Sequence, residues 1–175
     1  MSFLELAKKR ESCRSYDKSR PVEKEKIEEI LAASNLSPSA CNSQPYQVTV
    51  AEGEKGSAIA KACMGMGMNL FLGDAPVIIV ISEWDYNKTA AFGAKIKHND
   101  YRSIDIGILA AHITLAAADL DLGSCIIGWF DNKKIKEIIG TERDARLVIA
   151  LGYPKEEKPP REKRRKSTDE VFKII

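Results

Sequence analysis

The segment from Ser103 to Leu120 constrains the fold more than any other part of the sequence. Its isoleucines and leucines stand among alanines, so apolar side chains cover most of a helical circumference. A helix that is apolar most of the way round has to be buried. We therefore expect this helix to pack against a sheet and against a second subunit.

Four segments are candidates for the strands of that sheet. Pro76–Ser82 is apolar and β-branched, which is typical of a buried central strand. Ser124–Trp129 and Leu147–Leu151 also indicate buried strands, and Tyr46–Ala51 alternates weakly between apolar and polar residues. The strands mix with helices along the chain, which predicts one α+β domain with a sheet flanked by helices.

The remaining helices are predicted from capping residues and from helical spacing of apolar residues. The expected helices are Ser2 to about Lys9 with a capping box, Glu23–Ser34, Lys55–Asn69 loosening at Met64–Met68, and a short one from Asp131 or Asn132 to before Gly140. Trp84–Asp100 has no clear period and favours a loop or lid. Pro154–Lys166 is too charged and too rich in proline for a core element.

Charge is distributed unevenly along the chain. Residues 153–175 hold eight Lys/Arg and five Asp/Glu, a balance of +3, whereas the whole chain is only +2. An anion is therefore expected near the C-terminus, although a solvated charged tail is the plain alternative. The tail lacks interleaved aromatic residues, which argues against nucleic acid.

The cysteine and hydropathy patterns limit the metal sites and the cellular compartments that are expected for this chain. The four cysteines form no C-x-x-C pair and only two histidines occur, so no metal site is expected. Lys8, Lys9 and Arg10 interrupt the first apolar stretch, and no run of about 18 apolar residues could span a membrane. We expect a cytoplasmic protein with free thiols and no membrane partner.

Three separated motifs follow one another along the chain. They are Arg10-Glu11-Ser12-Cys13-Arg14-Ser15-Tyr16, Ser37-Pro38-Ser39-Ala40-Cys41-Asn42-Ser43-Gln44-Pro45-Tyr46, and Leu122-Gly123-Ser124-Cys125-Ile126-Ile127-Gly128. As an ordered set they resemble motifs of the FMN-dependent nitroreductase superfamily. Asp74-Ala75-Pro76 before a strand and Asp105-Ile106-Gly107 in the long helix are similar to that family too. The resemblance reaches from residue 10 to about residue 170.

The resemblance implies an architecture. The fold would be a three-layer α+β fold with a mixed, mostly antiparallel sheet, as an obligate homodimer that holds FMN at its interface. Residues 1–175 would form a single FMN-binding domain, with 153–175 as a basic extended tail. The short Trp84–Asp100 segment would make this a compact member, and the tail lacks the proline usual after the family's basic pair.

The phosphate of FMN needs cations, and a planar guanidinium can bind it with two hydrogen bonds. In an extended segment Arg10, Ser12 and Arg14 would point to one side. By position in the family's tail, Lys163 and Arg165 would reach the same phosphate. The alternative for the arginines is a pair of surface charges after a helix.

Other residues would meet the flavin ring, if the resemblance holds. Pro38, Ser39 and Asn42 would approach it from the partner subunit, and Asn69 would contact it. Ile127 and Gly128 would present backbone N–H groups to the N5/O4 edge, where glycine allows close approach of the main chain.

The implied activity is transfer of hydride from NAD(P)H through FMN N5 to a nitroaromatic, quinone or related small acceptor. The protein then binds, orients and tunes the cofactor and needs no catalytic side chain. Alternatives are a flavin-fragmenting or dehalogenating member, or a non-enzymatic flavin-binding protein. Candidate substrate contacts are Lys95, Lys97, His98, Asn99 and Tyr101.

Overall fold

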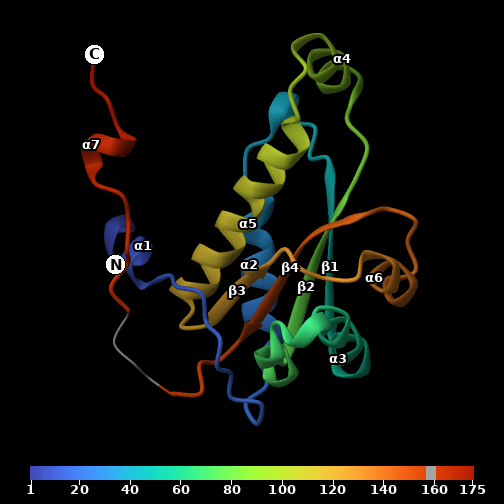
Figure 1. Cartoon of the computed structure of the whole chain (residues 1–175), viewed down its shortest axis with the longest axis vertical. Coiled ribbons are helices and arrows are strands. Elements are labelled where there is room, and N and C mark those ends of the chain that lie inside the picture. Colours follow the sequence, from blue (N-terminus) through green and yellow to red (C-terminus); the bar gives the residue numbers. More distant parts are fainter. Residues whose placement is uncertain (157–160) are drawn as a thin grey trace.

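The computed structural model describes residues 1–156 and 161–175 (Figure 1). It contains a four-stranded sheet with the order β1-β2-β4-β3. The strands are β1 Tyr46–Glu52, β2 Val77–Glu83, β3 Gly123–Ile127 and β4 Ala145–Gly152. All three ladders are antiparallel, and a parallel bridge joins Ser12 to Ser124 at the β3 edge. The predicted mixed, mostly antiparallel sheet is confirmed.

The sheet separates two apolar cores, which makes the fold three layers deep. Side chains of β2 alternate between its faces, because successive strand residues point to opposite sides. Ile78 and Val80 enter a core with α3 (Gly53–Ala62) and α6 (Asn132–Ile139). Val77, Ile79 and Ile81 enter a core with α2 (Lys24–Asn35) and α5 (Tyr101–Asp119). All five are fully buried, as the β-branched run predicts for a central strand.

Five helices lie where the sequence predicts them, with shifted ends. They are α1 Phe3–Lys9, α2 Lys24–Asn35, α3 Gly53–Ala62, α5 Tyr101–Asp119 and α6 Asn132–Ile139. The capping box of α1 is present, since Ser2 Oγ accepts from the Glu5 N–H and Glu5 accepts from the Ser2 N–H. Among the described residues, no helix combines the length and apolar character needed to cross a membrane.

One prediction is wrong, and another is confirmed only in part. Lys88–Lys97 forms α4 inside the segment expected to be a loop or lid, and Asn87 caps it. Ala90 is its one buried residue, so packing imposes almost no apolar period on this helix. The helix predicted over Lys55–Asn69 ends at Ala62, and the chain does not resume it. Met66 has a φ angle of 58° within the 3-10 turn Gly65–Gly67, and Asn69 has a φ angle of 57° just before the 3-10 turn Leu70–Asp74.

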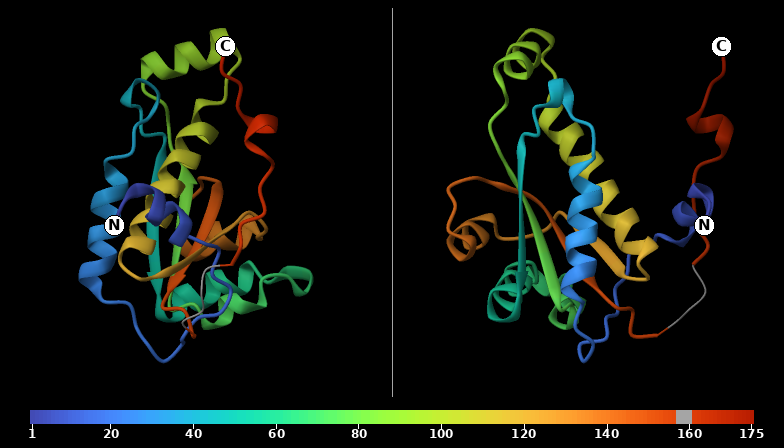
Figure 2. Two further views of the ribbon diagram at one scale, coloured as in Figure 1. Left: turned by 90° about the vertical axis from the view of Figure 1, so that its left-hand side faces the viewer. Right: turned by 180° about the vertical axis from the view of Figure 1, so that it is seen from behind.

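The two ends of the chain lie side by side, as Figure 2 shows for α1 and the segment after residue 161. The short helix α7, Thr168–Val171, follows in the tail and was not predicted from the sequence. The predicted tail includes residues 157–160, which lie outside the described residues.

Candidate functional site

Basic residues from both chain ends surround one cavity. Its volume is about 330 Å³ and it is lined by Arg10, Glu11, Ser12, Arg14, Arg161, Glu162, Lys163, Arg164 and Arg165. All five residues predicted for the phosphate therefore meet here. The predicted convergence of the two termini is confirmed as geometry, and the binding of phosphate stays a prediction.

The basic residues that line the cavity form a cation cluster of Arg10, Arg14, Arg161, Lys163, Arg164 and Arg165. The N-terminal half of this cluster is held by the edge of the sheet. The Cys13 N–H donates to the Ser124 carbonyl at 2.9 Å, and the buried Tyr16 hydroxyl donates to the Cys13 carbonyl at 3.1 Å. A Cβ on Gly123 would lie only 2.7 Å from the Cys13 side chain. Glycine at 123 therefore lets residues 10–14 reach β3.

The tail half is held by the N-terminal segment. Arg161 donates from its guanidinium to the Ser12 carbonyl at 2.8 Å, and its backbone N–H donates to the Glu11 carboxylate at 3.2 Å. The Lys163 ammonium donates to the Ala7 carbonyl at 2.9 Å and to that of Lys8 in the last turn of α1. A cation there complements the helix dipole.

Positive charge in the cluster exceeds the acids that face it. Burial, followed by repulsion from Arg10 and Arg165, lowers the pKa of Lys163. Within the part of the chain that the structure describes, Glu11 pairs with Arg161, and no carboxylate pairs with Arg10 or Arg14. The cavity is therefore suited to an anion of more than one charge.

The backbone becomes accessible at Gly128, just past the far end of β3. Ile127 is buried, but Gly128 is exposed, and a Cβ added to it would meet no atom within 4 Å. The Asn69 amide donates to the Cys63 carbonyl at 3.1 Å and to the Trp129 carbonyl at 3.5 Å, next to Gly128. Strand rise puts Gly128 about 13 Å beyond Ser124 and the cations.

The 37–45 loop is tightly folded. Cys41, Asn42 and Gln44 have φ angles of 50°, 50° and 47°, which are strained for residues other than glycine. Ser39 Oγ accepts from the Gln44 N–H at 3.0 Å, and buried Asp105 accepts from the Ala40 N–H at 3.0 Å. Pro38 and Asn42 are exposed and Ser39 is half-buried.

This loop does not meet the cation cluster within the chain. Asp105 holds the loop near the start of α5, whereas Lys9 pairs with Asp121 just past its end. A helix rises about 1.5 Å per residue, so the two sites are separated by roughly 20 Å along α5. The fold of this chain thus joins the predicted phosphate residues and the end of β3, and leaves Pro38, Ser39 and Asn42 apart.

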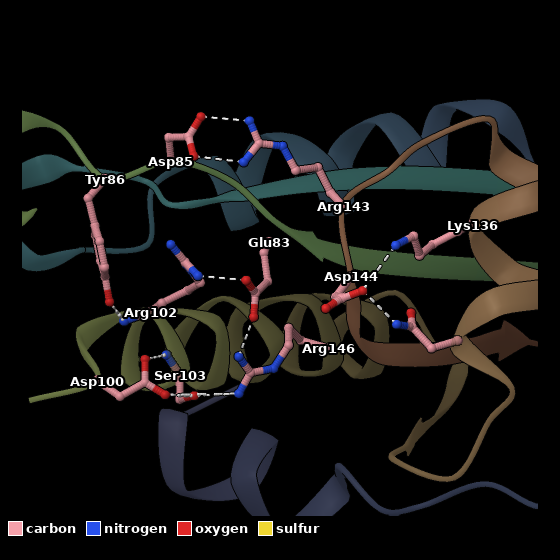
Figure 3. Close-up of polar contacts among 11 residues, drawn as sticks. Glu83, Asp85, Tyr86, Asp100, Arg102, Ser103, Lys136, Arg143, Asp144 and Arg146 are labelled. Carbon is pink, nitrogen blue, oxygen red and sulfur yellow. Dashed lines mark hydrogen bonds and ion pairs between the residues drawn. The ribbon is translucent and has the colours of Figure 1, made fainter.

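An ionic network fixes the frame around the 84–101 segment (Figure 3). Glu83 accepts from Arg102 at 2.6 Å and from Arg146 at 2.5 Å, which joins the end of β2 to α5 and β4. Arg143 forms two hydrogen bonds with Asp85, at 2.7 and 2.6 Å. The candidate substrate contacts lie beyond this frame: Lys95, Lys97, His98 and Asn99 are exposed, and Tyr101 is half-buried.

Sequence reasoning missed Arg161 and Arg164 as lining residues of the cavity. Both belong to the basic tail in which the composition predicts an anion, but the resemblance to the family implies only Lys163 and Arg165 as ligands. Among the described residues no cluster of His, Cys, Asp and Glu could hold a metal ion.

Comparison with known proteins agrees with the motifs. A family model described as "Nitroreductase family" matches residues 7–67 and 66–153. A Streptococcus pyogenes protein named as a candidate NAD(P)H nitroreductase is 27% identical over 91% of this chain and 94% of its own. An FMN-dependent nitroreductase structure from Clostridium difficile has 28% identity and a TM-score of 0.78, covering 97% of this chain and 98% of that one. A nitroreductase family structure from Streptococcus pneumoniae has 25% identity and a TM-score of 0.82, covering 99% and 100%.

Proposed function

The chain belongs to the nitroreductase family, and on that premise we propose that it is an NAD(P)H-dependent oxidoreductase with FMN as its cofactor. When bound, FMN would supply the hydride chemistry at N5 between the nucleotide and a small acceptor. The single observation that carries the proposal is the convergence of both chain ends on one cation cluster.

The cluster would hold the phosphate of FMN. The cavity is lined by Arg10, Ser12, Arg14, Lys163 and Arg165, whose guanidinium, ammonium and hydroxyl groups would donate to the phosphate. The excess of positive charge there matches a phosphate dianion, and charge-assisted hydrogen bonds to phosphate are strong.

The accessible backbone just past β3 would hold the flavin ring. Exposed Gly128 leaves room for a flat group against the backbone, with the N–H groups of Ile127 and Gly128 as donors. The ribityl chain would follow β3 from the cations to this backbone. Asn69 lies beside it and would contact the ring. A cation near the ring would stabilise its anionic reduced form.

A second copy of the chain would complete the site. Its Pro38, Ser39 and Asn42 would approach the ring, since these residues lie away from the cations of their own subunit. A groove of about 520 Å³ between α1, α2 and α5 is lined mainly by apolar residues, together with Glu29, His112 and Asp119, and it supports an interface on the exposed face of α5. Val171, Phe172, Ile174 and Ile175 of the tail are also exposed, as expected of a segment that packs on a partner.

The proposed acceptors are nitroaromatics, quinones and related flat electrophiles. Phe92 and Ile96 lie four residues apart on α4, so they share one helix face, and both are exposed. This apolar face would cover an acceptor above the ring. We further propose a single domain of residues 1–175 with the basic tail 153–175, in a cytoplasmic setting.

An absorption spectrum tests the proposal. We expect the purified protein to be yellow or to take up FMN stoichiometrically. NADH or NADPH should bleach the flavin under anaerobic conditions, and a nitroaromatic or quinone should restore its colour. Protein that binds no flavin would overturn the proposal. If FMN binds but neither NADH nor NADPH reduces it, the protein is a flavin-binding protein and the proposed reductase activity is wrong.

A further inference from the structure

Asn87 joins the start of α4 to the 39–44 loop by two hydrogen bonds, and a third caps the helix. Its backbone N–H donates to Ser43 Oγ at 2.8 Å, and its side-chain amide donates to the Cys41 carbonyl at 2.9 Å. Its side-chain oxygen caps α4 by accepting from the Ala90 N–H at 2.8 Å. One side chain therefore holds the helix at one end and the loop at the other.

The loop depends on such external contacts. Left-handed backbone at Cys41, Asn42 and Gln44 persists only when the surroundings enforce it. Ser39 supplies local support through its Oγ and its carbonyl, which accept from the Gln44 and Asn42 N–H groups. Asp105 and Asn87 supply the side-chain support from outside the loop.

Helix α4 in turn depends on the loop. Within α4 only Ala90 is buried, so little apolar packing fixes the helix. The chain before it is fixed at Asp85 by Arg143 and at Tyr86, whose hydroxyl accepts from the Arg102 N–H at 2.6 Å (Figure 3). Beyond these anchors, the bonds of Asn87 are what connect the start of the helix to the loop.

We propose that Asn87 is a positioning residue that couples α4 to the 39–44 loop. The helix that would cover the acceptor then adopts its position together with the loop that would meet the flavin. Binding at the loop would order α4, and movement of α4 would disturb the loop. This inference rests on the proposed function, because it assigns the loop to the flavin and the helix to the acceptor.

The variant Asn87→Ser separates coupling from helix capping. Serine is as good an N-cap as asparagine, so the bond to the Ala90 N–H can be kept. Its hydroxyl is too short to replace the amide that reaches the Cys41 carbonyl. Asp131→Ser, at the N-cap of α6, is the matched control, because Asp131 caps its helix without contacting the loop.

Hydrogen exchange with and without FMN measures the coupling. In the wild type, FMN should slow amide exchange in both the 39–44 loop and α4. In Asn87→Ser only the backbone bond to Ser43 remains between the helix and the loop. Loop amides should then exchange faster without FMN, FMN should slow α4 much less than in the wild type, and the KM for the acceptor should rise several-fold. The control should retain the wild-type pattern.

Two outcomes have different meanings. Equal slowing of α4 by FMN in Asn87→Ser and in the wild type would overturn the coupling while leaving the proposed function intact. A wild-type protein that binds no FMN would instead overturn the proposed function. In that case, unchanged loop exchange in FMN-free Asn87→Ser would also refute the positioning role.

Discussion

Gly123 shows how one residue permits the candidate site to form. A methyl group there would meet the Cys13 side chain at 2.7 Å, and both positions are buried. Gly123→Ala should therefore lower the free energy of unfolding by about 1–3 kcal/mol, the usual cost of overpacking. Urea denaturation measures this loss, and the second change Cys13→Gly should recover part of it.

The matched control for that variant is Gly107→Ala. Gly107 lies in α5, where an added Cβ meets no atom within 4 Å. Alanine there should raise the free energy of unfolding by about 0.5–1 kcal/mol, because glycine is unfavourable inside a helix. If both variants destabilise the protein equally, close packing at Gly123 is not the cause.

Replacement of Arg165 tests the proposed phosphate site. Arg165→Ala should weaken FMN binding by about 1.5–3 kcal/mol, the usual worth of a charged hydrogen bond. Its neighbour Lys166 does not line the cavity, so Lys166→Ala should leave the affinity nearly unchanged. Fluorescence titration of FMN measures both. Equal losses in the two variants would indicate a diffuse effect of tail charge and remove Arg165 from the site.

Asp105 gives the stability a predictable dependence on pH. Burial raises the pKa of this carboxyl above its ordinary 3.8, and within the described residues its Oδ2 has no partner. The folded chain then holds the proton at pH values where the unfolded chain has released it. Unfolding free energy should therefore fall as pH rises from about 4 through the folded pKa.

Denaturation of the wild type and Asp105→Asn between pH 4 and 8 checks this dependence. Asparagine keeps an oxygen for the Ala40 N–H but does not titrate. As pH rises, the unfolding free energy of Asp105→Asn should increase relative to that of the wild type. A difference that stays constant with pH would show that the carboxyl does not titrate in this range.

At the scale of elements, burial decides what the sequence could predict. β2 and α5 pack on the cores, so their residues show the pattern of a buried strand and a buried helix. α4 buries only Ala90, so its sequence has no apolar periodicity from which a helix could be predicted. Asn87 was the available signal, because a capping residue marks a helix start without any apolar period.

Phe92, on the exposed apolar face of α4, tests whether this face covers the acceptor. Phe92→Ala should raise the KM for a nitroaromatic or quinone several-fold, because an aromatic surface for a flat acceptor is lost. FMN affinity and the rate of bleaching by NADH or NADPH should stay close to wild type. Thr89→Ala is a matched control in the same exposed helix. An unchanged KM in Phe92→Ala would remove this face from the acceptor site.

At the scale of the molecule, the motif residues themselves do not say whether one chain or two supply a site; only the family resemblance implied that the loop with Pro38, Ser39 and Asn42 comes from a partner. Arg10 and Lys163 were predicted to share one phosphate, and the structure brings them to one cavity. The helical rise of α5 holds the Asn42 loop away from that cavity. Motif order contains no information about this separation, which comes from the packing of whole elements.

The separation leads to a test that mixes two defective proteins. One carries Arg14→Glu in the cation cluster, and the other carries Ser39→Ala and Asn42→Ala in the loop. Each should bind FMN poorly alone. After denaturation and refolding together, about half of the dimers should be mixed, and each mixed dimer should contain one site built from two intact halves.

About a quarter of all sites should then regain FMN, as measured by bound flavin after gel filtration. The reason is geometric: an intact cluster from one chain meets an intact loop only when the loop comes from the other chain. If each subunit completed its own site, every site in the mixture would contain one damaged half, and no flavin would return. Failure to regain flavin, with mixed dimers shown to be present, would refute the shared site.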